Sequence, residues 1–209
     1  MCGRYFIAEE DRSEELRQII EAVQRGLNRD VPLKERGEIH PSDVVPVCDA
    51  QTAVAAKWGF TLPGSSRLII NARSETFRER PMFREAAPCL IPASGYFEWE
   101  NVAYPEPEQM SLFEYDGKSK SVKSRKEKRA IHPKGKQTFY MAGLLRYEAG
   151  FELPVFTILT RPVASELAHI HDRMPMILSD EDAKDWLAKG KLPDVDGKEY
   201  GRYESRAAE

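Results

Sequence analysis

Residues 89–99 read CLIPASGYFEW, two short apolar runs that are separated by Pro, Ala, Ser and Gly. Short apolar runs with this punctuation are typical of β-strands. The pattern recurs along the chain and predicts strands at residues 53–58, 68–70, 89–91, 96–99, 139–145, 155–159 and 176–178. Residues 41–47 are predicted to be a loop that enters a further strand. No strand–helix–strand rhythm accompanies them, so we expect an antiparallel or mixed sheet.

Three helices are predicted outside these strands. Residues 13–27 place Leu16, Ile19, Ile20, Val23 and Leu27 at helical spacing, with charges on the other faces. A short helix is predicted at residues 163–169. A third is predicted at residues 180–189, where Ser179 can cap the start and Gly190 follows the end. The predicted fold class is α+β, with a strand-rich, barrel-like mixed or antiparallel sheet and a few flanking helices.

The composition is that of an ordinary globular protein. The chain has 209 residues, of which 41% are hydrophobic and 31% charged, and we expect one domain over residues 1–209. It shows no membrane-spanning run and no signal peptide, so we expect a monomeric cytoplasmic protein. Three cysteines without metal-ligand spacing favour a reducing compartment and predict neither a disulfide framework nor a metal site. No cofactor motif is present, and a net charge of −3 does not indicate nucleic-acid binding unless cations cluster locally.

Residues 101–136 form a polar stretch that differs from its surroundings. Between Lys118 and Lys136 it holds nine Lys or Arg residues and one acid, Glu127. One interpretation is a solvated, partly disordered surface insertion. The other is a flexible basic arm that touches a phosphate backbone.

Cys2 carries the most distinctive chemistry in the chain. If Met1 is removed, Cys2 has an α-amine with a reference pKa of about 7.7–8.0 next to a thiol with one of about 8.5. Such a 1,2-aminothiol condenses with an aldehyde to an imine, and the sulfur then closes a five-membered thiazolidine. Ring closure is intramolecular and therefore fast. The alternative is a terminal Cys that only begins a strand.

Three later segments concentrate polar side chains that this chemistry would need. They are residues 71–76, which follow an apolar run, residues 89–99 and residues 170–178. Glu98 or His171 could move protons while a carbinolamine loses water, and an amide such as Asn71 could orient an amine. The guanidinium groups of Arg4, Arg73 and Arg173 could hold phosphates. Each of these residues also has an ordinary structural interpretation, such as turn formation by Asn71.

Several separated motifs resemble the SOS-response-associated peptidase family, the SRAP domain. They occur in the family's order and span the chain from Met1 to about Leu187. The matching stretches are MCGRY at 1–5, WGF at 58–60, NARSET at 71–76, CLIP at 89–92, GYFEW at 95–99, AGL at 142–144 and IHDRMP at 170–175.

The resemblance implies a sensor of abasic sites in single-stranded DNA, free or at a junction with duplex, in the cytoplasm on the nucleoid. Cys2 would capture the ring-opened sugar as a thiazolidine DNA–protein crosslink. Asn71 would orient the reacting terminus, Glu98 would transfer protons, and His171 would be the acid–base partner. This lyase-like activity accompanies the thiol peptidase or self-processing activity that the family name suggests.

The resemblance also implies contacts with the DNA. Arg4, Arg73 and Arg173 would hold phosphates, and Thr160 is a further candidate. For Trp58 and Trp99 two roles stay open, stacking on DNA bases and packing in the core.

Three other interpretations remain open from the residues. An N-terminal-nucleophile hydrolase of the amidotransferase kind also begins Met-Cys-Gly, although here Arg4 follows where that class typically has an apolar residue. Peptidase action confined to the release of Met1 is the second. A non-covalent single-strand DNA-binding module is the third.

Overall fold

The computed structural model describes residues 2–28, 30–104, 123–194 and 202–208, and it contains two main sheets. The smaller sheet is antiparallel throughout. In spatial order its strands are β15 (Tyr203–Ala207), β10 (Lys123–Pro133), β9 (Gly95–Tyr104), β1 (Arg4–Ile7) and β2 (Gly37–Ile39). The inward face of β1 carries Tyr5 and Ile7, which are buried, so this short strand is held by its apolar side chains.

The larger sheet closes on itself. Its ring runs β12 (Val155–Pro162), β4 (Ala53–Trp58), β3 (Val44–Cys48), β8 (Ala87–Ala93), β11 (Phe139–Arg146) and back to β12. Strands β13 (Arg173–Pro175), β14 (Ile177–Leu178) and β7 (Asn71–Arg73) extend it, and β12 pairs in parallel with β4 and β7. The expected α+β class with a barrel-like mixed sheet is therefore confirmed.

The chain passes from the barrel to the smaller sheet within residues 89–99. Strand β8 ends at Ala93 and β9 begins at Gly95, so this connection between the barrel and the smaller sheet is a single residue, Ser94. A Cβ atom at Gly95 would lie 2.3 Å from the ring of Phe6 and 3.0 Å from the carbonyl oxygen of Ile131. Only glycine leaves room for this crossing.

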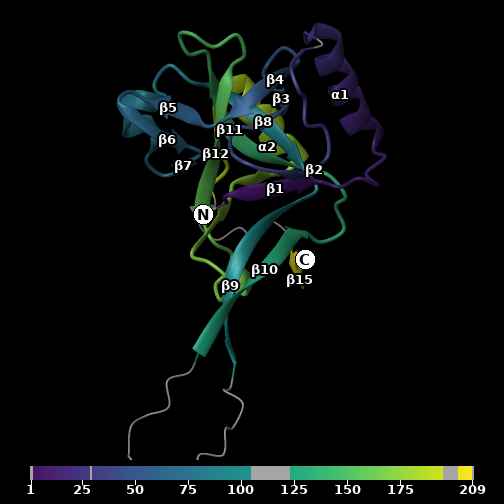
Figure 1. Cartoon of the computed structure of the whole chain (residues 1–209), viewed down its shortest axis with the longest axis vertical. Helices are drawn as coiled ribbons and strands as arrows, with labels where there is room; N and C mark the ends of the chain where they lie inside the picture. Colours follow the sequence, from purple (N-terminus) through teal and green to yellow (C-terminus); the bar gives the residue numbers. More distant parts are fainter. Residues whose placement is uncertain (1, 29, 105–122, 195–201, 209) are drawn as a thin grey trace, which may run out of the picture.

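Two α-helices flank the barrel (Figure 1). Helix α1 (Glu14–Gly26) packs on β3 and β4, and buries its apolar side chains Leu16, Ile19, Ile20 and Val23. Helix α2 (Asp180–Lys189) lies against β8, β11 and β14. Its start is capped by Ser179, whose side chain accepts the amide hydrogen of Asp182, and Gly190 ends it at φ +61°. The helices predicted at residues 13–27 and 180–189 are therefore confirmed.

Several sequence predictions need correction. Residues 163–169 form only the 3₁₀ turn η3 (Ser165–Leu167) instead of a helix. Further 3₁₀ turns are η1 (Phe77–Glu79) and η2 (Pro81–Phe83). The predicted strand at residues 68–70 corresponds to the end of β6 (Ser65–Ile69), whereas its hairpin partner β5 (Phe60–Leu62) and the C-terminal β15 have no counterpart among the predicted strands. Strand β15 is mostly exposed, so it lacks the apolar pattern on which strand prediction depends.

The polar stretch at 101–136 contains the two strands of a β-ribbon, at 101–104 and 123–133. Strands β9 and β10 pair from Tyr96 with Ile131 out to Tyr104 with Lys123, and the ribbon projects from the body (Figure 1). Ala130 and Ile131 are buried in the core. Both ends of the stretch are therefore ordered strands, whereas its middle, residues 105–122, lies outside the described residues, so the two interpretations of the insertion stay predictions.

The described residues give two further facts about the chain as a whole. No helix among them is long and apolar enough to cross a membrane. Cys2, Cys48 and Cys89 are all free thiols, of which Cys2 and Cys89 are buried.

Candidate functional site

Cys2 lies just before β1 with its side chain completely buried. Its thiol donates a hydrogen bond to the carbonyl oxygen of Arg4 over 3.5 Å. The register of β1 on β9 sets Arg4 opposite Phe97, which brings the start of the chain to the neighbourhood of Glu98. Burial raises the pKa of the Cys2 thiol, and the negative charge of Glu98 raises it further. The thiol is therefore held in its neutral form.

Asn71 begins β7 and reaches Cys2 from the barrel. The parallel pairing of Asn71 with Ile158 of β12 fixes its backbone. The side-chain Nδ2 then donates to the carbonyl oxygen of Cys2 over 2.8 Å, although the two residues are 69 positions apart. A residue of the barrel thus holds the backbone of Cys2, which leads into the smaller sheet.

Glu98 lies on the inward face of β9 and is 4% exposed. Burial raises the pKa of this carboxyl group, the charges of the N-terminal amine and of His171 oppose the rise, and Asp172 adds to it. A carboxyl group in such surroundings retains its proton at a higher pH than an exposed glutamate. It is therefore a more suitable proton donor than an exposed glutamate at the same pH.

His171 stands in the loop before β13, close enough to Glu98 for its charge to affect the carboxyl group. Its Nδ1 accepts the backbone amide hydrogen of Arg173 over 3.1 Å and lies 2.6 Å from Oδ1 of Asp172. These neighbours fix the orientation of the ring. The structure therefore brings Cys2, Asn71, Glu98 and His171 together at the junction of the two sheets.

Arg173 and Thr160 form a separate group beside this site. The guanidinium of Arg173 donates to both carboxylate oxygens of Glu75, over 2.6 and 2.9 Å, and to the carbonyl oxygen of Thr160 over 2.7 Å. Its side chain is only 11% exposed. The Thr160 hydroxyl is fully buried and donates to the carbonyl oxygen of Ala72. The hydroxyl is thus enclosed in this structure, and a contact of Thr160 with DNA stays a prediction.

Arg73 and Arg4 are the more accessible of the predicted phosphate contacts. Arg73 is exposed at the end of β7, two residues from Asn71. The Arg4 side chain is 41% exposed, pairs with Glu38 over 2.9 Å, and lies over the ring of Trp99, 5.1 Å from its centroid. This stacked pair forms part of the outward face of the smaller sheet.

The two predicted tryptophans lie in different surroundings. Trp58 is fully buried, packs edge-on against Tyr5, and donates its Nε1 hydrogen to the carbonyl oxygen of Ile70. Of its two predicted roles, base stacking is wrong and core packing is right. Trp99 is half-buried under Arg4, so a surface role stays a prediction.

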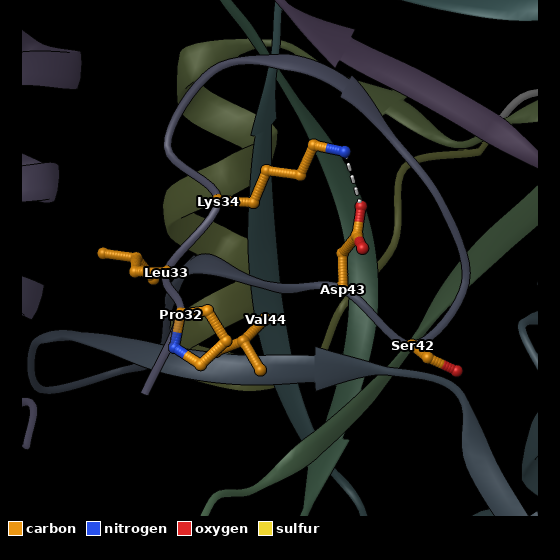
Figure 2. A pocket seen from close by; sticks show the side chains of 6 residues that line it. All are labelled: Pro32, Leu33, Lys34, Ser42, Asp43 and Val44. Carbon is orange, nitrogen blue, oxygen red and sulfur yellow. Dashed lines mark ion pairs between the residues drawn. The ribbon is translucent and has the colours of Figure 1, made fainter. Parts of the chain in front are cut away.

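A pocket lies apart from this site and is shown in Figure 2. Its six lining residues are Pro32, Leu33, Lys34, Ser42, Asp43 and Val44. Lys34 and Asp43 form an ion pair of 3.0 Å within it. None of the residues predicted for chemistry lines this pocket. Over the described ranges of the chain, no group of three or more His, Cys, Asp or Glu side chains is placed to hold a metal ion.

The sequence analysis did not single out several charged groups that the structure places beside the site. Asp172 follows His171 directly, and Glu100 shares the inward face of β9 with Glu98. Arg129 of β10 stands opposite Glu98 in the register of the ribbon. Period-2 alternation along the strand from Tyr96 would have placed Glu100 with Glu98, whereas Arg129 depends on a register that no local pattern shows.

Comparison with known proteins supports one family. The family model described as SOS response associated peptidase (SRAP) matches residues 1–202. Abasic site processing protein YoqW of Bacillus subtilis is 32% identical over 210 residues, which cover 90% of this chain and 80% of that protein. Abasic site processing protein YedK of Escherichia coli is 27% identical over 95% of this chain and 83% of that protein.

Solved structures agree on the fold. A protein from Bordetella bronchiseptica superimposes with a TM-score of 0.68 at 21% identity, and the match covers 100% of both chains. A protein from Bacteroides thetaiotaomicron gives a TM-score of 0.65 at 21% identity and covers 100% of this chain and 92% of that one.

Proposed function

Because this chain belongs to the SOS response associated peptidase (SRAP) family, we propose that it processes abasic sites by capturing them covalently through Cys2. Two lines of support are independent of each other. Its relatives YoqW and YedK are named abasic site processing proteins. The buried cluster around Cys2 contains the acid, the imidazole and the amide that aldehyde condensation needs. The substrate we propose is single-stranded DNA whose abasic sugar has opened to an aldehyde.

The proposed reaction balances without an oxidant or reductant. Removal of Met1 gives Cys2 a free amine, which adds to the aldehyde carbon to form a carbinolamine. The hydroxyl group then leaves as water and an imine remains. The Cys2 sulfur bonds to the imine carbon while its proton passes to the nitrogen, and a thiazolidine results. The product is the protein plus the DNA less one water molecule.

The surroundings of Cys2 set the order of these steps. Because burial raises the pKa of the thiol, little thiolate is available to attack first. The amine therefore begins the reaction, and the sulfur closes the ring once the imine is held beside it. A neutral thiol also brings the proton that the nitrogen needs on closure.

The single observation that carries the proposal is the hydrogen bond from Asn71 Nδ2 to the carbonyl oxygen of Cys2. It fixes the backbone next to the amine and the thiol, so that both groups are oriented before the aldehyde arrives. Glu98, whose pKa burial raises, then supplies the proton with which the carbinolamine hydroxyl leaves. His171 is the neighbouring group that exchanges this proton with Glu98.

Phosphate contacts complete the proposed site. Arg73 is exposed two residues beyond Asn71, and Arg4, whose side chain is 41% exposed, lies two residues beyond Cys2, so each cation follows closely on one member of the cluster. They read the DNA backbone and no base, which suits a lesion that has lost its base. Arg173 reaches a phosphate only if it gives up its pair with Glu75.

A denaturing gel tests the proposal. Protein with Met1 removed, as shown by intact mass, is mixed with a single-stranded oligonucleotide that carries one abasic site. Cys2→Ala and an undamaged strand are the controls, and a second substrate places the lesion at a duplex junction. The proposal predicts a shifted band that needs both Cys2 and the lesion.

Two other results would overturn it. A band that persists in Cys2→Ala would place the bond on another nucleophile. No band at all, with binding retained, would leave the non-covalent module, and glutaminase turnover would then decide whether the chain is an amidotransferase-like hydrolase. The fate of Met1 in Cys2→Ser separates self-processing, which needs Cys2, from an external aminopeptidase, which does not.

A further inference from the structure

An ion pair on the ribbon lies beside the proposed acid. Glu98 and Glu100 are two residues apart on β9, so their side chains point to the same face. The register places Arg129 of β10 directly opposite Glu98 on that face. Side chains directly opposite each other in an antiparallel pair have Cβ atoms about 4.5–5.5 Å apart, whereas diagonal neighbours stand about 7–8 Å apart. Simple proximity would therefore favour a pair between Arg129 and Glu98.

The structure shows the diagonal pair instead. Nε of Arg129 donates to Oε2 of Glu100 over 2.6 Å. The other oxygen of Glu100 faces His169, whose Nε2 lies 3.9 Å away, so Glu100 is held between two basic groups. The Glu100 side chain is 16% exposed and that of Arg129 is 25% exposed, which limits the competition from water for this pair.

The charged and titratable groups around Glu98 come from four parts of the chain. The N-terminal amine and Cys2 approach from before β1, His171 and Asp172 from the loop before β13, and Tyr96 from β9 itself. Arg129 is the one permanent cation that the register sets opposite Glu98, among the residues described. A guanidinium that turned onto Glu98 would hold it as a carboxylate and remove the proton that the reaction uses.

We propose that Glu100 is a positioning residue that holds Arg129 away from Glu98 and so keeps Glu98 able to carry a proton. The consequence for catalysis rests on the proposed function. The placement of Arg129 does not depend on that function. Glu100 touches no reacting atom in this arrangement. It acts by competing with Glu98 for the same guanidinium.

The first test measures Glu98 itself, in protein without DNA. The titration of its carboxyl carbon is followed by ¹³C NMR in wild type, Glu100→Ala, Arg129→Met and the double variant. In Glu100→Ala the titration of Glu98 should move to lower pH by about one pH unit, because Arg129 turns to Glu98 while Glu127, the other carboxylate on this face, stays paired with Arg125. The double variant should titrate as the wild type does, and Arg129→Met alone should change little.

Three results of this titration would overturn the inference. The first is an unchanged Glu98 titration in Glu100→Ala. The second is a double variant that stays as displaced as Glu100→Ala, which would mean that the effect does not pass through Arg129. The third is a large change in Arg129→Met, which would mean that Arg129 already acts on Glu98.

The second test follows capture of an abasic oligonucleotide as a function of pH. Glu127→Ala is the matched control, because Glu127 stands directly opposite Glu100 on the ribbon but pairs with Arg125 over 2.7 Å, so its loss removes a neighbouring carboxylate and leaves the pair of Arg129 with Glu100. In Glu100→Ala the high-pH limb of the rate profile should move down by about one pH unit, which slows capture about tenfold on that limb. Glu127→Ala should keep the wild-type profile.

The two tests separate the possible failures. If the wild-type protein captures no lesion, the proposed function fails while the NMR titration still tests the placement of Arg129. If capture occurs and the profile of Glu100→Ala coincides with that of Glu127→Ala, the positioning role is refuted. Thermal melting of each variant shows that the compared proteins are folded. If Glu100→Ala melts early, the comparison of Arg129→Met with the double variant still shows whether Glu100 acts through Arg129.

Discussion

Two buried carboxyl groups, those of Asp11 and Glu98, lie near the point where the chain crosses between the sheets. Their pKa values are shifted in opposite directions. Asp11 accepts hydrogen bonds from the hydroxyls of Thr138 and Ser94 and from the backbone amide of Ser13. Burial alone would raise its pKa, but these hydrogen bonds outweigh burial and lower it. Around Glu98 burial outweighs the opposing charge of His171, and its pKa is raised.

The difference shows that burial does not by itself give a carboxylate its role. Three donors lock Asp11 as an anion that joins the segment before α1 to Ser94 and to the start of β11. Glu98 depends on groups that can themselves change charge, such as His171. We infer that Asp11 serves stability and Glu98 serves chemistry. Each prediction below would break or sharpen this contrast.

The largest effect is expected from Glu98→Gln. Loss of the carboxyl group should slow capture of an abasic strand by about 10²–10⁴-fold, the usual range for a general acid–base residue. Thermal melting should not be lowered, because a neutral amide costs less to bury than a carboxylate whose charged form is already disfavoured. Glu127→Gln on the same ribbon is the control. A Glu98→Gln protein that captures at the wild-type rate would remove the contrast.

The opposite pattern is expected from Asp11→Ala. It leaves the hydroxyls of Thr138 and Ser94 and the amide of Ser13 without their acceptor, which should cost about 3 kcal/mol of unfolding free energy. Urea denaturation measures this loss, with the neighbouring exposed Glu10→Ala as the control. The folded fraction should capture at the wild-type rate. A capture rate that falls with stability intact would give Asp11 a chemical role and contradict the account.

A smaller effect is expected from Asn71→Ala. This change removes one hydrogen bond, to the carbonyl oxygen of Cys2, which is worth about 1–1.5 kcal/mol and corresponds to about tenfold in rate. Binding to an undamaged strand should change little, since Arg73 and Arg4 remain. Single-turnover capture and equilibrium binding measured on the same variant separate the two quantities. Equal losses in both would show that Asn71 acts in binding and not in orienting Cys2.

The smallest effect concerns the dependence of stability on pH. Asp11 has a lowered pKa, so the stability it contributes is present above its ordinary value of 3.8 and is lost as pH falls through its folded value. Glu98 has a raised pKa, so its contribution is present below its ordinary value of 4.5 and is lost as pH rises through its folded value. Urea unfolding from pH 3 to 8 should therefore show the Asp11→Asn difference shrinking in acid and the Glu98→Gln difference growing toward neutrality. Parallel curves for both variants would contradict these assignments.

Much of the fold could be predicted because local patterns suffice for it. The helical spacing of Leu16 to Val23 and the apolar runs of β4, β8, β11 and β12 each lie within one window of sequence. The strand pairs that close the barrel could not be predicted. Closure depends on β12 meeting β4 and β11 across long separations, and no single segment carries that information.

The candidate site, too, could be predicted only in part from the sequence. The residue types that aldehyde condensation needs are recognisable at Cys2, Asn71, Glu98 and His171. Burial is not readable from residue type, so the sequence could neither decide between stacking and core packing at Trp58 nor show that the core encloses Thr160. The choice of Arg129 between Glu98 and Glu100 depends on strand register and side-chain direction, which only the folded ribbon defines.

The central claim, that Cys2 captures the lesion as a thiazolidine, is tested most directly by the mass of the product and the position of the adduct. Protein without Met1 is incubated with an abasic oligonucleotide, and the intact adduct and its peptides are analysed by mass spectrometry without added reductant. The account predicts the sum of the two masses less one water, with the adduct on Cys2. An adduct on a lysine, or one that survives only after borohydride reduction, would contradict it.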